Sequence, residues 1–124
     1  MHQLLTDIFE EHPGKAVHIA LGRYPHVEFD RGTMEVTTNL DAPLNPEKMA
    51  EIINSLITEA DGAFLKKRGS VGTRINDEFY QRDIKIVHNP KEVVVDITSR
   101  LLQDIQAENN KLIAASDTMA LIKG

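Results

Sequence analysis

Two blocks of alternating apolar and polar residues flank one long amphipathic segment, and this order limits the folds open to the chain. In residues 17–36 the apolar residues recur with a period of two, as they do in half-buried strands. The same period returns in residues 71–97. Between the two blocks, residues 46–64 repeat their apolar residues with the period of an α-helix. Two runs of strands separated by one strong helix are typical of an α+β protein with an antiparallel sheet.

The central helix has a clear start and an interrupted second half. Asn45 is suited to cap the first turn, and Pro46 fits the first helical position, where its missing N–H is not needed. Gly62 predicts either a kink or a short second helix over residues 61–68. Gly69 follows three cations and is expected to end the helix in the left-handed conformation. The apolar stripe assigned to the core consists of Met49, Ile52, Ile53, Leu56, Ile57, Ala60 and Phe64.

A further helix is expected at each end of the chain. Residues 2–11 carry apolar residues at helical spacing before a Pro-Gly pair ends the run. A last helical segment begins at Ser99, but its apolar stripe is soon interrupted. We therefore expect an α+β domain over residues 1–100 and a C-terminal helical extension, residues 101–124, that docks on a partner or forms an oligomer.

The expected fold is α-βββ-α-βββ-α, a single antiparallel sheet of about five to six strands with helices packed on one face. Turns are expected at residues 30–32, 76–78 and 89–91. The residues expected to face the helices are Val17, Ile19, Val27, Phe29, Met34, Val36, Ile75, Ile84, Ile86, Val93, Val95 and Ile97. The residues expected to face water on the other side are His18, His26, Glu28, Glu35, Arg74, Asp83, Lys85 and Asp96.

Composition excludes several classes of function. The chain has 124 residues and a formal net charge of −5, so we do not expect it to bind nucleic-acid phosphates. It has no cysteine, which excludes disulfides, thiolate metal sites and cysteine nucleophiles. The N-terminal segment contains Asp7, Glu10 and Glu11 where a signal peptide needs an apolar run, and no run of about 18 apolar residues occurs. We expect a cytoplasmic protein that does not insert into a membrane.

Several short motifs follow one another in an order found in a known family. They are, in chain order, VHI at 17–19, GRYP at 22–25, VEFDRG at 27–32, PL at 43–44 and a helix with a late Phe64. In this order they resemble the N-terminal, PAS-like domain of the type IV pilus retraction ATPases and of the type II and type IV secretion ATPases. The resemblance covers residues 4–100 and implies a PAS-like module of a secretion or pilus machine.

Two departures from this family bear on activity. The family's ATPase domain carries a Walker loop, whereas the stretch GAFLKKRGS at 62–70 has no Lys-Ser/Thr after its second glycine. We therefore expect a stand-alone relative that lacks the ATPase domain and is not an enzyme. Family members also use arginines on a late strand to reach nucleotide on a neighbouring motor domain. Here the strand keeps Arg82, a candidate binding residue, but has Ile84 where a second arginine is common.

The outward residues of the first strands form one candidate binding surface. His18, His26, Glu28 and Glu35 are expected on one face of the sheet. Two imidazoles and a carboxylate could bind zinc or iron, but their spacing matches no ligand motif, so no metal site and no cofactor are predicted. His26 with Glu28 could form an acid–base pair, yet residues two apart on any strand share a face. No serine lies in a nucleophile elbow, and no catalytic residue is predicted.

A cationic patch, Lys66, Lys67 and Arg68, forms a second candidate surface. Three adjacent cations could bind an anionic ligand. Cations at the end of a helix also complement the negative end of the helix dipole, and this structural role is open to all three. Both readings of the patch stay open.

Three functions remain open from the sequence. The leading hypothesis is a non-catalytic interaction or adaptor module of a secretion or pilus-like assembly, which binds a protein partner or forms a homo-oligomer. The alternative is a type III secretion chaperone-like dimer that binds an effector segment. A weaker alternative is a small metal- or ligand-binding enzyme that uses His18, His26 and Glu28. In either binding hypothesis, an edge of the sheet could accept a strand from the partner.

Overall fold

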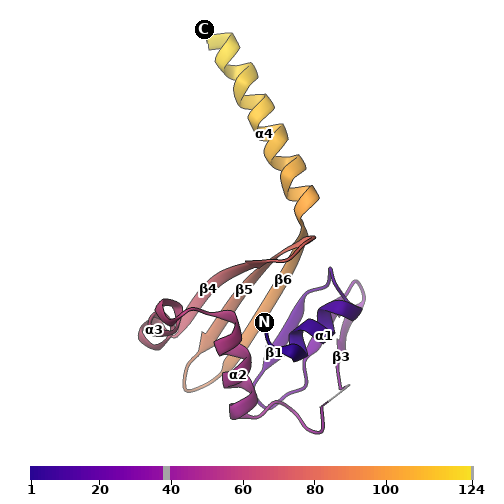
Figure 1. Cartoon of the computed structure of the whole chain (residues 1–124), viewed down its shortest axis with the longest axis vertical. Helices are drawn as coiled ribbons and strands as arrows, with labels where there is room; N and C mark the ends of the chain where they lie inside the picture. Colours follow the sequence, from indigo (N-terminus) through magenta and orange to yellow (C-terminus); the bar gives the residue numbers. More distant parts are fainter. Residues whose placement is uncertain (38–39, 124) are drawn as a thin grey trace.

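Four helices and one six-stranded sheet make up the described part of the chain, and the last helix projects away from the sheet (Figure 1). The computed structural model describes the backbone of residues 1–37 and 40–123 and the side chains of residues 1–37 and 40–113. The elements are α1 (Gln3–Glu11), β1 (Val17–Ala20), β2 (His26–Phe29), β3 (Gly32–Glu35), α2 (Pro46–Leu56), α3 (Glu59–Arg68), β4 (Ser70–Asn76), β5 (Tyr80–His88), β6 (Val93–Leu101) and α4 (Leu102–Lys123).

The strands form one six-stranded sheet in the order β3-β2-β1-β6-β5-β4. Every neighbouring pair is antiparallel. Each half of the chain supplies a meander of three consecutive strands, and the pairing of β1 with β6 joins the two meanders. The helices α1 and α2 lie on one side of the sheet (Figure 1). The predicted α+β fold, with one antiparallel sheet covered on one face, is confirmed.

The core lies between the helices and the apolar face of the sheet. Val17 and Ile19 of β1 pair with Ile97 and Val95 of β6, and none of these four side chains is accessible to solvent. Both covering helices bury the apolar stripes that their spacing predicted. The buried helical residues are Leu4, Leu5, Ile8 and Phe9 of α1 and Met49, Ile52, Ile53 and Leu56 of α2.

Three of the expected core residues lie instead at the surface. Ala60 is exposed, and Met34 and Phe64 are each 46% exposed. Met34 lies opposite Val27, but β3 is an edge strand whose four residues are all exposed. Ala60 and Phe64 lie on α3, where Leu65 is the buried residue. All three assignments were wrong for the same reason, since a period in the sequence does not reveal where the covering layer ends.

The central helix breaks earlier than the glycine predicted. α2 ends at Leu56, Ile57 is extended, and α3 begins at Glu59. Thr58 caps α3 with a capping box: its hydroxyl accepts from the Asp61 N–H at 3.2 Å, and the Asp61 carboxylate accepts from the Thr58 N–H at 3.3 Å. A kink at Gly62 was therefore wrong, and the second helix starts two residues before the predicted range.

The predicted caps at the outer ends of this helical pair are confirmed. The Asn45 side chain accepts a hydrogen bond from the Lys48 N–H at 2.8 Å, with Pro46 in the first turn. Gly69 ends α3 with a φ of +78°, a conformation that favours glycine because it has no Cβ. The chain therefore enters β4 directly from the basic end of α3.

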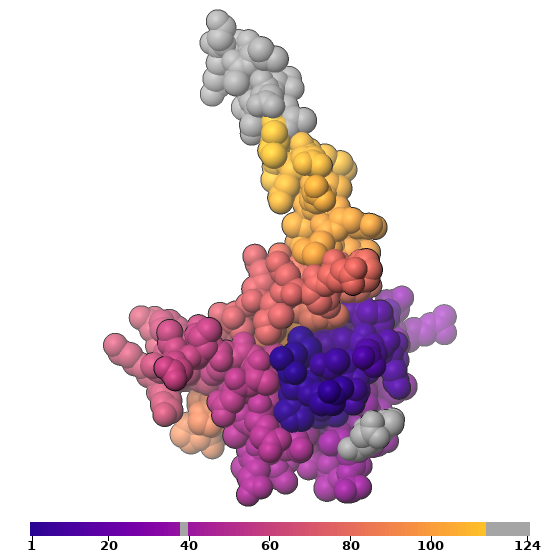
Figure 2. Space-filling view, viewed as in Figure 1, coloured from indigo at the N-terminus to yellow at the C-terminus, as the bar shows by residue number. Residues whose placement is uncertain are grey.

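α4 follows β6 without a loop and points away from the sheet. β6 continues to Leu101, so the helix starts later than Ser99, where the sequence placed it. Leu102 and Ile105 at its start are half-buried, and the helix then projects from the domain in Figure 2. Leu112 and Ile113 are 67% and 59% exposed. Within the described residues, no helix combines the length and the apolar composition needed to cross a bilayer. The domain boundary and the docking role of the extension stay predictions.

Two substitutions test where the central helix breaks. Thr58→Ala removes the capping box and is expected to lower the free energy of unfolding by about 1 kcal/mol. Gly62→Ala is expected to raise it by about 0.5 kcal/mol, because Gly62 is helical and an added Cβ would meet only the Ile57 side chain at 3.8 Å. Urea denaturation measures both changes. A hinge at Gly62 would give the opposite result, a destabilising Gly62→Ala and a neutral Thr58→Ala.

Candidate functional site

The face of the sheet away from the helices carries a band of ionisable side chains. We call this surface the open face. Its side chains are half-buried or exposed, and their cross-strand pairs agree with the face predicted for them. The residues of the open face are His18, His26, Glu28, Glu35, Arg74, Asp83, Lys85 and Asp96.

His18 lies at the centre of the open face and contacts a carboxylate through each ring nitrogen. Its Nδ1 is 2.7 Å from Asp96 Oδ1, and its Nε2 is 2.9 Å from Glu28 Oε2. An ionised carboxylate can only accept a hydrogen bond, so both ring nitrogens must donate. The geometry therefore selects the imidazolium form of His18.

The pKa of His18 is raised above its ordinary value of 6.5. The hydrogen bond to Asp96 is the largest cause, and the hydrogen bond to Glu28 comes second. Partial burial opposes both, because it disfavours the charged form. The three residues come from β6, β1 and β2, so the His18 cluster crosses the junction between the two meanders.

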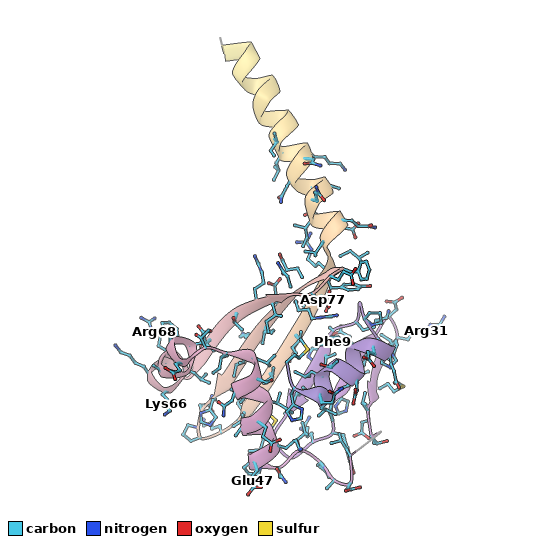
Figure 3. All side chains as sticks on the ribbon, in the orientation of Figure 1. Phe9, Arg31, Glu47, Lys66, Arg68 and Asp77 are labelled. Atoms are coloured by element: carbon cyan, nitrogen blue, oxygen red, sulfur yellow. The ribbon has the colours of Figure 1, made fainter. Side chains whose placement is uncertain are left out.

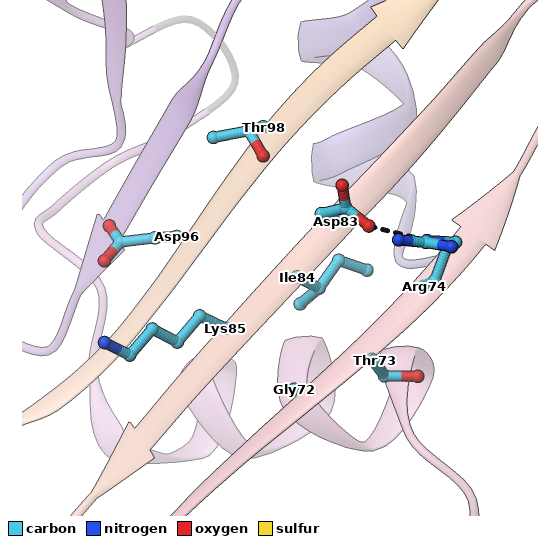
Figure 4. A pocket seen from close by; sticks show the side chains of 8 residues that line it. All are labelled: Gly72, Thr73, Arg74, Asp83, Ile84, Lys85, Asp96 and Thr98. Carbon is cyan, nitrogen blue, oxygen red and sulfur yellow. Dashed lines mark hydrogen bonds and ion pairs between the residues drawn. The ribbon is translucent and has the colours of Figure 1, made fainter. Parts of the chain in front are cut away.

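The remaining charges of the open face are also arranged in cross-strand pairs. Arg74 Nε donates to Asp83 Oδ1 at 2.7 Å, as the dashed line in Figure 4 shows. His26 Nε2 lies 3.7 Å from Glu35 Oε1. Lys85 lies directly opposite Asp96 in the strand register. Each of these three pairs places a basic side chain opposite an acidic one, and opposite charges on facing strands stabilise the sheet.

Two open hollows lie on this face. One, of about 550 Å³, is lined by Arg74, Asp83, Lys85, Asp96 and Thr98 together with Gly72 (Figure 4). The other, of about 380 Å³, includes His18, His26 and Tyr24 among its lining residues. Sites for small molecules are mostly concave and apolar. Both hollows combine charged and polar residues with apolar surface, from Ile84 in the first and from Ile19, Ala20 and Val94 in the second.

The open face offers no obvious metal centre. In the part of the chain that the structure describes, no group of three or more His, Asp or Glu side chains is arranged to hold a metal ion. A histidine that binds a metal presents a neutral ring nitrogen. Both nitrogens of His18 are engaged by carboxylates instead. Nothing here favours the metal-binding enzyme that the sequence left open.

Arg82 lies on the other face of the sheet and is 3% exposed. Its Nη1 donates to Pro13 O at 2.9 Å and to Ser99 Oγ at 2.6 Å, and Nε and Nη2 both donate to Asp77 Oδ2. Its guanidinium also lies 3.7 Å from the centroid of the Phe9 ring. Arg82 thus ties β5 to β6, to the end of α1 and to the β4–β5 turn. Its predicted binding role stays a prediction.

Asp77 holds Arg82 from the β4–β5 turn. Partial burial raises the pKa of this carboxyl, but hydrogen bonds from the backbone N–H groups of Tyr80 and Phe79, and the adjacent Arg82 guanidinium, outweigh that effect. The pKa of Asp77 therefore lies below its ordinary value. The carboxylate stays ionised and matches the buried cation.

The cationic patch lies apart from the open face. Lys66, Lys67 and Arg68 are exposed at the end of α3, and the Arg68 guanidinium lies 4.9 Å from the centroid of the Phe64 ring. Figure 3 shows Lys66 and Arg68 at the edge of the domain beside β4. These cations also occupy the last turn of α3, where they complement the helix dipole.

Sequence reasoning missed two partners. Asp96 was placed on the correct face, but its contact with His18 depends on the pairing of β1 with β6, across 78 positions of the chain. No local pattern encodes that register. Asp77 was noted only as part of a turn, and its hydrogen bonds to the N–H groups two and three residues later are typical of an Asx turn. That pattern could have marked it as a structured carboxylate.

Comparison with known proteins shows a likeness of fold. No protein-family model matches the chain, and no curated protein matches it. Among solved structures, the fold is similar to that of the pilus retraction motor PilT, in a crystal structure with bound ADP, with a TM-score of 0.58 and 15% sequence identity. The match covers 76% of this chain and only 27% of the PilT chain. The fold thus agrees with the one expected from the resemblance to the pilus retraction ATPases.

The pH dependence of stability tests the His18 cluster. Because the pKa of His18 is raised on folding, its contribution is fully present below pH 6.5 and is lost as the pH rises through the folded pKa. His18→Gln is therefore expected to lower the free energy of unfolding more at about pH 6 than at about pH 9. Urea denaturation at both pH values measures this difference. An equal effect at both would contradict the imidazolium assignment.

A matched pair of arginines tests the role of burial. Arg82→Ala removes a buried guanidinium and is expected to lower the free energy of unfolding by about 3 kcal/mol. Arg74→Ala removes a guanidinium that is 61% exposed and should cost no more than about 0.5 kcal/mol. Both arginines contact an aspartate at 2.7 Å, so the two variants differ in burial and not in the length of the ion pair. Equal losses of stability on thermal or urea denaturation would show that burial does not make Arg82 more important to stability than Arg74.

Proposed function

We propose that this chain is a non-catalytic protein-interaction module of a pilus or secretion assembly, related to the N-terminal PAS-like domain of the pilus retraction ATPases. The observation that carries the proposal is the fold, which is similar over 76% of this chain to part of a pilus retraction motor. The order of the strand and turn motifs in residues 17–44 supports the same relation. A cytoplasmic location, without insertion into a membrane, belongs to this proposal.

The chemistry of the open face supports binding rather than catalysis. A general base needs an unprotonated nitrogen, whereas the contacts of His18 hold it as an imidazolium. A residue that reaches a bound nucleotide needs free donors, whereas Arg82 uses its three nitrogens within the chain. The open face is a polar surface of paired basic and acidic side chains, and such surfaces give specificity to protein contacts.

His18, His26, Glu28 and Glu35 form the proposed contact surface on the first meander. Their positions are fixed by cross-strand pairs, with His18 opposite His26 and His26 opposite Glu35. Glu28 and Glu35 are mostly exposed and are available to cations of a partner. The proposed partner is the ATPase motor of the pilus or secretion system with which this chain works.

Binding to such a motor tests the proposal. Isothermal titration calorimetry of the full chain with the purified pilus or secretion ATPase of the same organism is expected to show a saturable complex. Glu35→Lys should weaken the complex at least tenfold, because it reverses an exposed charge on the contact surface. Glu92→Lys, an exposed charge reversal in the β5–β6 hairpin, is the matched control and should leave affinity unchanged.

Two outcomes would contradict the proposal. One is the absence of a complex with any pilus or secretion motor of that organism. The other is steady release of phosphate when the chain alone is incubated with ATP and magnesium, because the module is proposed to be non-catalytic. If Glu35→Lys and Glu92→Lys weaken the complex equally, the motor is still the partner, but the contact surface is not the open face.

A further inference from the structure

A pocket of about 390 Å³ lies on the helix side of the sheet, between α1 and the β4–β5 turn. Its walls are aromatic and apolar, and they come from Phe9, Pro13, Ile75, Phe79 and Tyr80. We call it the aromatic pocket. Of these residues, Phe79 is 62% exposed, which leaves a large apolar side chain in contact with water.

Two carboxylates give the aromatic pocket its charge. Among its lining side chains, Asp77 and Arg82 neutralise each other through their ion pair. Glu10 and Glu78 also line the pocket, are exposed, and have no ion pair among the described residues. An apolar pocket whose lining includes two carboxylates without an ion pair favours an occupant that combines apolar surface with positive charge.

The end of α3 presents such a combination on the same chain. We call Phe64, Lys66, Lys67 and Arg68 the basic knob. The ring of Phe64 is 46% exposed and lies under the Arg68 guanidinium. In the described part of the chain, none of the three cations forms an ion pair. The knob therefore carries an aromatic side chain and three positive charges that form no ion pair among the described residues.

The knob and the pocket lie at opposite ends of β4. α3 ends at Arg68, just before β4 begins at Ser70, and the pocket residues Asp77 and Glu78 directly follow its last residue. Figure 3 shows Lys66 and Arg68 at one end of this strand and Asp77 and Phe9 near the other. A seven-residue strand spans about 20 Å. The two surfaces cannot meet within one copy, but they can meet between two.

We propose that copies of this chain associate head to tail, with the basic knob of one copy seated in the aromatic pocket of the next. Phe64 then packs against the aromatic walls, and the knob cations face Glu10 and Glu78. Such a contact joins two different surfaces, so it builds a ring if the rotation closes and a filament if it does not. The proposal is independent of the pilus relation, because it involves only this chain.

Charge complementarity favours a second copy over an anionic membrane as the occupant. The net charge of −5 opposes approach to an anionic membrane and to a second copy alike, so the local charges decide between them. The pocket supplies both the carboxylates for the cations and an apolar site for Phe64. A membrane supplies no counterpart to the pairing of one knob with one pocket.

Charge-swap variants of the full chain test the proposal by sedimentation velocity. The knob variant is Lys66→Glu with Lys67→Glu, and the rim variant is Glu10→Lys with Glu78→Lys. The wild type is expected to associate as its concentration rises, and each variant alone should need at least tenfold more protein, because its knob and pocket then carry like charges. An equimolar mixture of the two variants should associate again, and so should one chain that carries all four changes.

Restored association in the mixture separates a specific contact from a folding defect, because a misfolded variant cannot be rescued by a second one. Phe64→Ala should also weaken association, while Lys91→Glu, an exposed reversal elsewhere, should not. A wild type that stays monomeric at all accessible concentrations would overturn the proposal. So would association that both variants leave unchanged, or a knob that binds phosphatidylserine vesicles in place of a second copy.

Discussion

The pairing of β1 with β6 brings the two ends of the domain together, and the rest of the structure is arranged around it. Val17 and Ile19 meet Ile97 and Val95 there, and all four are closed off from solvent. Without this pairing the chain would consist of two three-stranded meanders, each with an unpaired strand at its inner edge. Because the pairing spans about 80 residues of chain, its entropic cost must be met by long-range burial.

The same junction organises both faces of the sheet. On the helix side it provides the floor on which α1 and α2 bury their apolar stripes. On the open face it brings Asp96 of one meander beside His18 of the other. Arg82 then ties the second meander to the end of α1 through Pro13 and Phe9. The domain is therefore held by one apolar junction and two polar contacts that reach across it.

Local patterns in the sequence predicted the helices and strands well, but they could not predict the tertiary contacts. Alternation along the strands identified the two faces, and Asn45 and Gly69 marked helix ends correctly, because each of these features depends on near neighbours. The exposure of Met34 and Phe64 depends on where the covering layer stops. The contact between His18 and Asp96 depends on a strand register that no local pattern carries. The early break at Thr58 was encoded locally, but the continuing apolar stripe masked its capping signal.

The proposed binding of a pilus or secretion motor rests on the paired charges of the open face and on a fold similar to part of a pilus motor. Chemical-shift mapping by NMR, with the full chain titrated by such a motor, tests the proposal most directly. The signals expected to shift are those of His18, His26, Glu28 and Glu35 on the open face, while those of α2 stay in place. Shifts confined to the helix side of the sheet, or no shifts at all, would contradict the account.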